Sequence, residues 1–221
     1  SDVYEAADSG KLTMLRLLDL SAAFDTVDHQ ILLSRLRHSF GISGTVLDWI
    51  ASYLTGRTQF VRFNGQSSKT VPVTSGILLG SVLGPILFLT YTAAVVLVVR
   101  KHGFNVHAYA DDLQIYDHTA PSGMAGLLQR MVVCIENVST WMSSNQLCLN
   151  PSKTELVWLG SSRRLQNCAT DTEMSVLGSL IRPVDSVRDL GVLIDSGLTL
   201  SDHVNKVAAL CYFHIRQLRI V

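Results

Sequence analysis

Tyr109-Ala110-Asp111-Asp112 lies between two runs in which apolar and polar residues alternate. Such runs on either side of a short acidic turn predict a β-hairpin that holds two aspartates at its tip. Adjacent carboxylates repel each other, so the pair costs free energy unless a cation neutralises it. Divalent ions such as Mg²⁺ prefer oxygen ligands of this kind. A solvated Asp-Asp turn is the alternative interpretation, and the surrounding chain has to decide between the two.

A second acidic element follows the apolar run from Met14 to Leu18, which predicts a buried strand ending at Asp19. A carboxylate at the end of a buried strand is either hydrogen-bonded there or used chemically there. Asp19 and Asp111 are 92 positions apart. Only the fold could therefore bring these two carboxylates together.

Several segments carry apolar residues at spacings of three and four, which predicts amphipathic helices. These segments are residues 29–40, 46–54, 122–144 and 204–218. A further helix is predicted from about Pro85 to Val99, because proline suits the first turn of a helix. Core packing is the expected role of the stripes in residues 29–40 and 46–54.

The remaining segments favour extended structure. Residues 58–73 alternate around Asn64-Gly65, which is a strong hairpin signal because both residues tolerate positive φ. The other predicted strands lie near residues 156–159, 175–181 and 187–194. Residues 163–172 are polar and predict a loop. This order of elements predicts an α+β fold, in which helices cover one face of an antiparallel sheet and the other face is open for a duplex.

The composition is that of a packed globular chain. Hydrophobic residues make up 48% and charged residues 16% of the sequence, which excludes disorder. The formal net charge is +0, so charge alone gives no support to nucleic-acid binding, for which domains are usually basic. The cysteines show no metal-binding spacing, and three of them are expected to be reduced core residues. They are Cys134, Cys148, Cys168 and Cys211.

Residues 70–99 carry no charge and have the length of a membrane span. Proline and glycine interrupt the first half of this segment, however. The uninterrupted part, Ile86 to Val99, has 14 residues and fits a buried core helix better. A small membrane protein is nevertheless kept as one alternative.

Five segments, taken in order, resemble the motifs of reverse transcriptases from non-LTR (LINE-type) retrotransposons, most closely those of CR1-like elements. They are Leu18-Asp19-Leu20-Ser21-Ala22-Ala23-Phe24-Asp25-Thr26-Val27-Asp28-His29, Ser75-Gly76 through Gly80-Ser81-Val82-Leu83-Gly84-Pro85, the Tyr109–Asp112 stretch, Trp141 to Glu155, and Asp189 to His203. The resemblance covers nearly the whole chain. It implies a polymerase palm over residues 1–200, with residues 201–221 starting the thumb or a connecting helix.

The resemblance also implies a reaction. An RNA-directed DNA polymerase extends a DNA primer on an RNA template, using deoxynucleoside triphosphates and two Mg²⁺ ions, with Mn²⁺ as the alternative ion. Asp19 and Asp111 match the principal metal ligands of the family, and Asp112 matches the more peripheral carboxylate. Lys153 matches the lysine that assists departure of pyrophosphate. No membrane partner is expected, the family location is intracellular and nuclear, and the oligomeric state is left open.

Further positions match the nucleotide site of the family. The ring of Phe24 would exclude a 2′-hydroxyl, the carbonyl of Leu20 would add a metal ligand, and the backbone of Gly80 would lie near the nucleotide. Tyr109 and Leu79 complete the expected nucleotide-binding set. The family usually has Pro-Gln where this chain has Leu78-Leu79, and leucine cannot replace the hydrogen bonds of glutamine.

The chain starts 18 residues before Asp19, so the fingers and most of the thumb are expected to be missing and the isolated chain to be inactive. The alternatives are a catalytically silent palm that binds nucleic acid or protein, and the membrane protein considered above. The sequence leaves open the expression of the chain and its template specificity.

Overall fold

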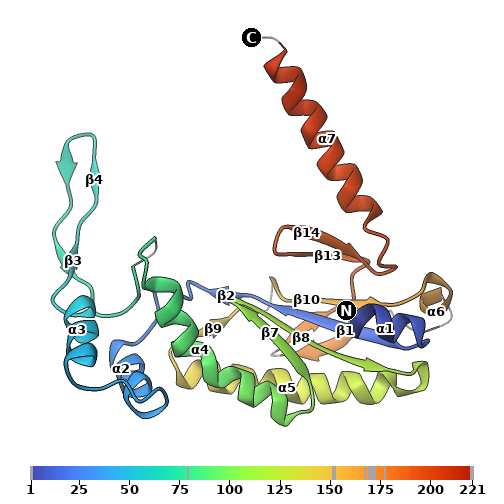
Figure 1. Cartoon of the computed structure of the whole chain (residues 1–221), viewed down its shortest axis with the longest axis horizontal. Coiled ribbons are helices and arrows are strands. Elements are labelled where there is room, and N and C mark those ends of the chain that lie inside the picture. Colours follow the sequence, from blue (N-terminus) through green and yellow to red (C-terminus); the bar gives the residue numbers. More distant parts are fainter. Residues whose placement is uncertain are drawn as a thin grey trace.

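A four-stranded antiparallel sheet with the strand order β10-β1-β8-β7 forms the centre of the computed structural model (Figure 1). Its strands are β10 (Glu155–Leu159), β1 (Leu12–Leu18), β8 (Asp112–Thr119) and β7 (Asn105–Tyr109). The structure describes residues 2–78, 80–150, 153–166, 168, 173–176 and 178–219. The predicted hairpin around Ala110 is confirmed as the β7–β8 connection.

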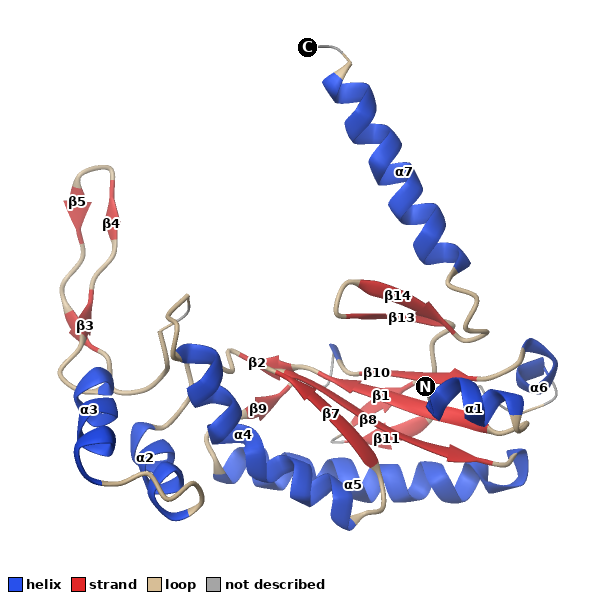
Figure 2. Cartoon of the chain, in the orientation of Figure 1, coloured by secondary structure: helices blue, strands red, loops and turns tan. Residues whose placement is uncertain are grey.

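Helices cover one face of this sheet, as the sequence predicted (Figure 2). The long helices α4 (Gly84–Lys101) and α5 (Met124–Ser144) bury their apolar stripes there, α2 packs against α4, and α3 packs against α2. These two shorter helices are α2 (His29–His38) and α3 (Gly44–Leu54). Even-numbered residues of β1, such as Met14 and Leu18, face this helical side and belong to the large core cluster.

Among the described residues, α4 is the one helix long and apolar enough to cross a membrane by length and composition. It buries Phe88, Tyr91, Val95 and Val99 in the core, as the central helix of a packed domain does. Nothing in the structure supports the membrane alternative.

The second face of the sheet is covered in part, which corrects the expectation of a fully open face. The hairpin of β13 (Ser186–Asp189) and β14 (Val192–Asp195) lies over it (Figure 1). A smaller apolar cluster fills the space between them, because the strands also carry apolar residues on this side. Its buried members are Leu15, Tyr116, Val157, Leu159 and Val187.

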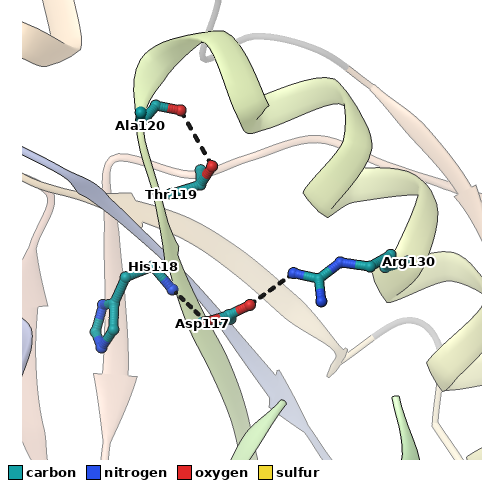
Figure 3. Close-up of polar contacts among 5 residues, drawn as sticks. All are labelled: Asp117, His118, Thr119, Ala120 and Arg130. Atoms are coloured by element: carbon teal, nitrogen blue, oxygen red, sulfur yellow. Dashed lines mark hydrogen bonds and ion pairs between the residues drawn. The ribbon is translucent and has the colours of Figure 1, made fainter. Parts of the chain in front are cut away.

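An ion pair joins α5 to the end of β8 (Figure 3). Arg130 Nη2 lies 2.6 Å from Asp117 Oδ2, and the backbone N–H of His118 donates to Asp117 Oδ1 at 2.8 Å. The guanidinium of Arg130 also lies over the ring of Phe104, 5.1 Å from its centroid. The contact links the helix to the strand that carries Asp112.

Arg16 is the charged residue within the buried run of β1, and its side chain is fully enclosed on the helical face. Its Nη1 contacts the Met174 Sδ at 3.9 Å, and burial lowers the pKa of the guanidinium to about 10. The thioether is a weak acceptor, so the surroundings compensate poorly for the lost hydration.

Two segments project from the body on the side of the β13–β14 hairpin (Figure 1). One is the hairpin arm, defined here as residues 57–73, which contains four short strands. These are β3 (Thr58–Gln59), β4 (Arg62–Phe63), β5 (Gln66–Ser67) and β6 (Val71–Pro72). The predicted turn at Asn64-Gly65 is confirmed, with φ of 49° and 78° at its two residues. The other projection is α7 (Ser201–Leu218), none of whose described residues is buried.

The smaller elements complete the chain. They are α1 (Asp2–Asp8), β2 (Leu20–Ser21), β9 (Cys148–Leu149), the 3₁₀ turn η1 (Pro121–Gly123), α6 (Ser162–Gln166), β11 (Met174–Val176) and β12 (Ser179–Ile181). The loop prediction for residues 163–172 is wrong at its start, because 163–166 are helical. Residues 167 and 169–172 lie outside the described residues.

The cysteine expectation is also corrected. Cys134 is buried in the core, where burial raises the pKa of its thiol to about 12. Cys168 is half-buried, and Cys148 and Cys211 are exposed. Cys211 lies on α7 among apolar residues, and the local pattern gave no sign that this helix would leave its apolar face uncovered.

Candidate active site

A cleft of about 110 Å³ lies at the end of β1, beside β8 and beneath the β13–β14 hairpin. Charged and amide side chains dominate its wall. The lining residues are Leu17, Leu18, Asp19, Asp112, Leu113, Gln114, Lys153, Glu155, Arg188, Asp189 and Leu190. The cleft therefore collects residues from segments that are far apart in the sequence.

Strand register explains why Asp19 and Asp112 share this cleft. Leu17 pairs with Gln114 and Leu18 with Leu113, so β1 reaches Asp19 where β8 begins at Asp112. Side chains alternate across a strand, which places Asp112 and Gln114 on the same face as Leu17. The strand β1 ends there, and the Asp19 carbonyl accepts a hydrogen bond of 2.9 Å from the backbone N–H of Asn150. Two carboxylates thus meet on the face opposite α5.

Asp111 occupies a different position from its neighbour. Tyr109 pairs with Asp112 across a two-residue turn, in which Ala110 has a φ of 52°. Asp111 is the second turn residue and is not among the residues that line the cleft. Asp112 is the first residue of β8 and lines the cleft together with Asp19. The role of Asp111 as a principal metal ligand stays a prediction.

Carboxylates outnumber basic groups in the cleft, where four acidic side chains meet one lysine and one arginine. Asp19 Oδ2 is buried and has no hydrogen-bond partner among the described residues, while the Lys153 Nζ lies 3.6 Å from it. Burial raises the pKa of Asp112, and the charges of Asp111, Asp19 and Asp189 raise it further. A cation bound among these groups would remove the repulsion.

Asp189 is a cleft residue to which the sequence argument assigned no role in the site, although it opens the last of the five motifs. It accepts a hydrogen bond of 2.7 Å from the Gln114 Nε2. Burial raises its pKa, and this hydrogen bond partly opposes the rise. The missed signal was a hairpin like that at Asp112: Asp189 pairs with Val192 across Leu190-Gly191, whose φ values of 45° and 89° mark a tight turn.

The loop 75–77 docks onto the segment that follows Asp19. The Gly76 N–H donates to the Val27 carbonyl and the Ile77 N–H to the Phe24 carbonyl, each at 2.8 Å. A side chain at Gly76 would place its Cβ 2.9 Å from the Asp25 carbonyl oxygen, and the φ of 90° also favours glycine. The first two motifs are therefore joined by backbone contacts that no local pattern encodes.

Of the expected nucleotide-binding residues, Phe24 takes part in this junction. Phe24 is half-buried and stacks on Phe88 with ring centroids 4.5 Å apart. Leu20 is buried in β2, Tyr109 is 66% exposed, and Gly80 has a φ of 78° with open space around it. Leu79 lies outside the described residues. Their roles toward a nucleotide stay predictions.

The donor set of the cleft fits a hard divalent cation, since carboxylate oxygens predominate and one buried oxygen has no donor. Within the part of the chain that the structure describes, however, no three His, Cys, Asp or Glu side chains close around a single point. Asp19 and Asp112 are accordingly the pair best placed to hold an ion, with Asp189 beside them.

The chain is similar in sequence to proteins of Drosophila mobile elements over most of its length. It is 26% identical over 208 residues to the RNA-directed DNA polymerase from mobile element jockey of Drosophila melanogaster, covering 92% of this chain and 22% of that protein. It is 28% identical over 212 residues to the probable RNA-directed DNA polymerase from transposon X-element of the same fly, covering 93% and 22%. The chain thus spans about a fifth of the length of these relatives.

Solved structures share the fold. The chain superposes with a TM-score of 0.60 and 13% identity on apo telomerase from Candida tropicalis truncated from the C-terminal domain, covering 90% of this chain and 38% of that one. The model of the family described as reverse transcriptase (RNA-dependent DNA polymerase) matches residues 2–194. The chain therefore belongs to the reverse transcriptase family, as a domain of the kind found in non-LTR mobile elements.

Proposed function

We propose that this domain carries out RNA-directed DNA synthesis at the cleft shared by Asp19 and Asp112. The observation that carries the proposal is the meeting of these two carboxylates, 93 positions apart, with Lys153 beside them. The substrates would be an RNA template, a DNA primer and deoxynucleoside triphosphates. We also propose a palm over residues 1–200 and the start of a thumb at 201–221, which agrees with the beginning of α7 at Ser201.

Asp19 and Asp112 would hold Mg²⁺ through their carboxylate oxygens, with Asp111 as a further ligand if its turn moves toward the cleft. Bound divalent ions would supply Lewis-acid activation of the primer hydroxyl and neutralise charge on the departing phosphate. Lys153 has a mostly exposed side chain that already reaches within 3.6 Å of Asp19 Oδ2. It can therefore offset the charge of pyrophosphate or donate a proton to it.

Phe24 would separate deoxynucleotides from ribonucleotides. Its ring is half-buried, and stacking on Phe88 restricts its position. Phe24→Ala should therefore lower the ratio of kcat/KM for deoxynucleotide over ribonucleotide in any active form of the protein. An unchanged ratio would assign the ring to core packing only.

Cation binding tests the proposed site in the chain itself. We expect Mn²⁺ affinity, measured by electron paramagnetic resonance, to fall by at least about tenfold in Asp19→Asn and in Asp112→Asn. Asp117→Asn is the matched control, because it removes the same charge from the far end of β8. Equal affinities in all four proteins would rule out the proposed ion site.

Primer extension then tests the reaction. We expect little extension of a DNA primer on an RNA template by the isolated chain, because substrate positioning contributes roughly 7–11 kcal/mol and depends on contacts around the palm. Extension that disappears in the double variant Asp111→Ala/Asp112→Ala would contradict this expectation of inactivity and support the reaction directly. Cation binding without extension in a longer polypeptide would favour a catalytically silent palm. We also propose that the protein is located in the nucleus, as is expected for this family.

A further inference from the structure

The hairpin arm exposes aromatic and apolar side chains of the kind that are usually buried in the core of a protein. Phe60 is 58% exposed, Val61 71% and Phe63 75%. Every residue of β3, β4, β5 and β6 is exposed, so the strands of the arm are not buried by any other part of the described chain. An apolar surface of this kind usually marks a binding site.

The arm is also positively charged, in a chain without net charge. Arg57, Arg62 and Lys69 lie on it, and no acidic residue occurs between positions 49 and 110. This span holds five of the 18 basic residues and none of the 18 acidic ones. The neutral total therefore conceals a segregation of charge, which favours an anionic partner for the arm.

The arm projects on the side of the molecule that carries the β13–β14 hairpin (Figure 2). It rises from the end of α3, and the β13–β14 hairpin covers the cleft. Arg57 is held at the base of the arm, where its guanidinium lies 4.3 Å from the centroid of the Tyr53 ring. Phe60, Arg62, Phe63 and Lys69 are the side chains left to meet a partner.

We propose that the hairpin arm binds single-stranded nucleic acid, with Phe60 and Phe63 stacking on bases and Arg62 and Lys69 contacting phosphates. Aromatic rings accept any base by stacking, and basic side chains beside them follow the backbone. The proposal rests on the proposed function only in taking the strand to be RNA. A protein partner would account for the exposed aromatic rings but not for the absence of acidic residues over the whole span.

Fluorescence anisotropy with a fluorescein-labelled oligouridine, in EDTA and without nucleotide, tests the arm separately from catalysis. We expect the dissociation constant to rise at least about tenfold in Phe60→Ser/Phe63→Ser. In Arg62→Gln/Lys69→Gln, we expect the slope of log affinity against log salt to fall by about 1.4, from the loss of two phosphate contacts.

Matched variants on the other projection provide the controls. Tyr212→Ser/Phe213→Ser and Lys206→Gln/Arg216→Gln make the same chemical changes at exposed positions of α7, and we expect both to bind as the parent does. No binding by the parent, or equal losses in arm and control variants, would overturn the proposal.

A variant of the cleft separates the two proposals. Asp19→Asn/Asp112→Asn should bind oligouridine like the parent even though it loses Mn²⁺. If the parent protein proves to bind no Mn²⁺ but still binds oligouridine through the arm, the proposed reaction fails and the assignment of the arm remains valid. Loss of oligouridine binding in this cleft variant would overturn the arm as the binding site.

Discussion

The central strand β1 and the hairpin arm are both extended structure, yet they place opposite demands on their residues. Six of the seven residues of β1 are buried and the seventh, Leu17, is half-buried, whereas all eight strand residues of the arm are exposed. In β1, packing on both faces decides which side chains fit. In the arm, packing places little restriction on the residue types, so its exposed aromatic and basic side chains are better explained by binding to a partner.

The difference teaches where stability and binding reside. A two-stranded ribbon has only marginal stability of its own, because it buries little apolar surface. Substitutions in the arm should therefore alter binding while leaving the folded state nearly unchanged. Substitutions in the core under the sheet should instead lower stability. The following changes test this division between a stabilising core and a binding arm.

The largest effect is expected from removing a core ring. Phe88→Ala should lower the free energy of unfolding by about 3–5 kcal/mol, because Phe88 is fully buried and stacks on Phe24. Phe63→Ala, the same change on the arm, should stay within about 0.5 kcal/mol of the parent. Urea unfolding followed by circular dichroism measures both, and similar losses would abolish the division between sheet and arm.

Gly76 should come next, because its loop joins the first two motifs. Gly76→Ala is expected to lower the free energy of unfolding by about 1–3 kcal/mol, because a φ of 90° is strained for alanine. The close approach of the added Cβ to the Asp25 carbonyl oxygen should lower it further. Gly126→Ala is the control, since Gly126 lies in α5 with open space around it. We expect this control substitution to raise the free energy of unfolding by up to about 1 kcal/mol, because alanine favours the helix more than glycine does. A tolerated alanine at Gly76 would mean that the loop adjusts freely.

The ion pair between sheet and helix should contribute less (Figure 3). The Arg130 side chain is 50% exposed, and water weakens such pairs. A double-mutant cycle of Arg130→Gln and Asp117→Asn should therefore give a coupling of about 0.2–1 kcal/mol that decreases in high salt. A coupling well above this range would show that the pair is screened from solvent.

The smallest effect is expected at the base of α7. Burial tends to raise the pKa of Asp195, but hydrogen bonds from Thr199 and Leu200 outweigh it and lower the pKa overall from 3.8. A carboxyl whose pKa is lower in the folded state stabilises it above the unfolded value, and this contribution is lost as the pH falls through the folded value. Asp195→Asn should therefore reduce stability slightly at pH 7 and not below the folded pKa.

Urea unfolding across this pH range measures the effect, with Glu136→Gln on the exposed side of α5 as the control. The control removes one carboxylate charge without these hydrogen bonds, so its small effect should differ in pH profile. Identical profiles for the two variants would assign the change to net charge instead of to the Asp195 contacts.

The sequence by itself determined the elements that depend on local chemistry. Apolar spacing predicted α5, the uncharged run after Pro85 predicted α4, and Asn64-Gly65 predicted a turn that needs two positive φ values. The acidic turn at Asp111-Asp112 was predicted as part of a hairpin from the alternating apolar and polar residues on either side of it. The order of motifs also led to the family, since residue identities in sequence carry that information directly.

Only the tertiary structure decided which of these elements meet. Register between β1 and β8 brought Asp112 to the end of β1 where Asp19 lies, and the β13–β14 hairpin added Asp189 to the cleft. A local pattern specifies which face of an element is apolar, but not what covers that face. The apolar stripes of α5 and α7 look alike in the sequence, yet one is buried under the sheet and the other is exposed, because burial depends on contacts between segments distant in the chain.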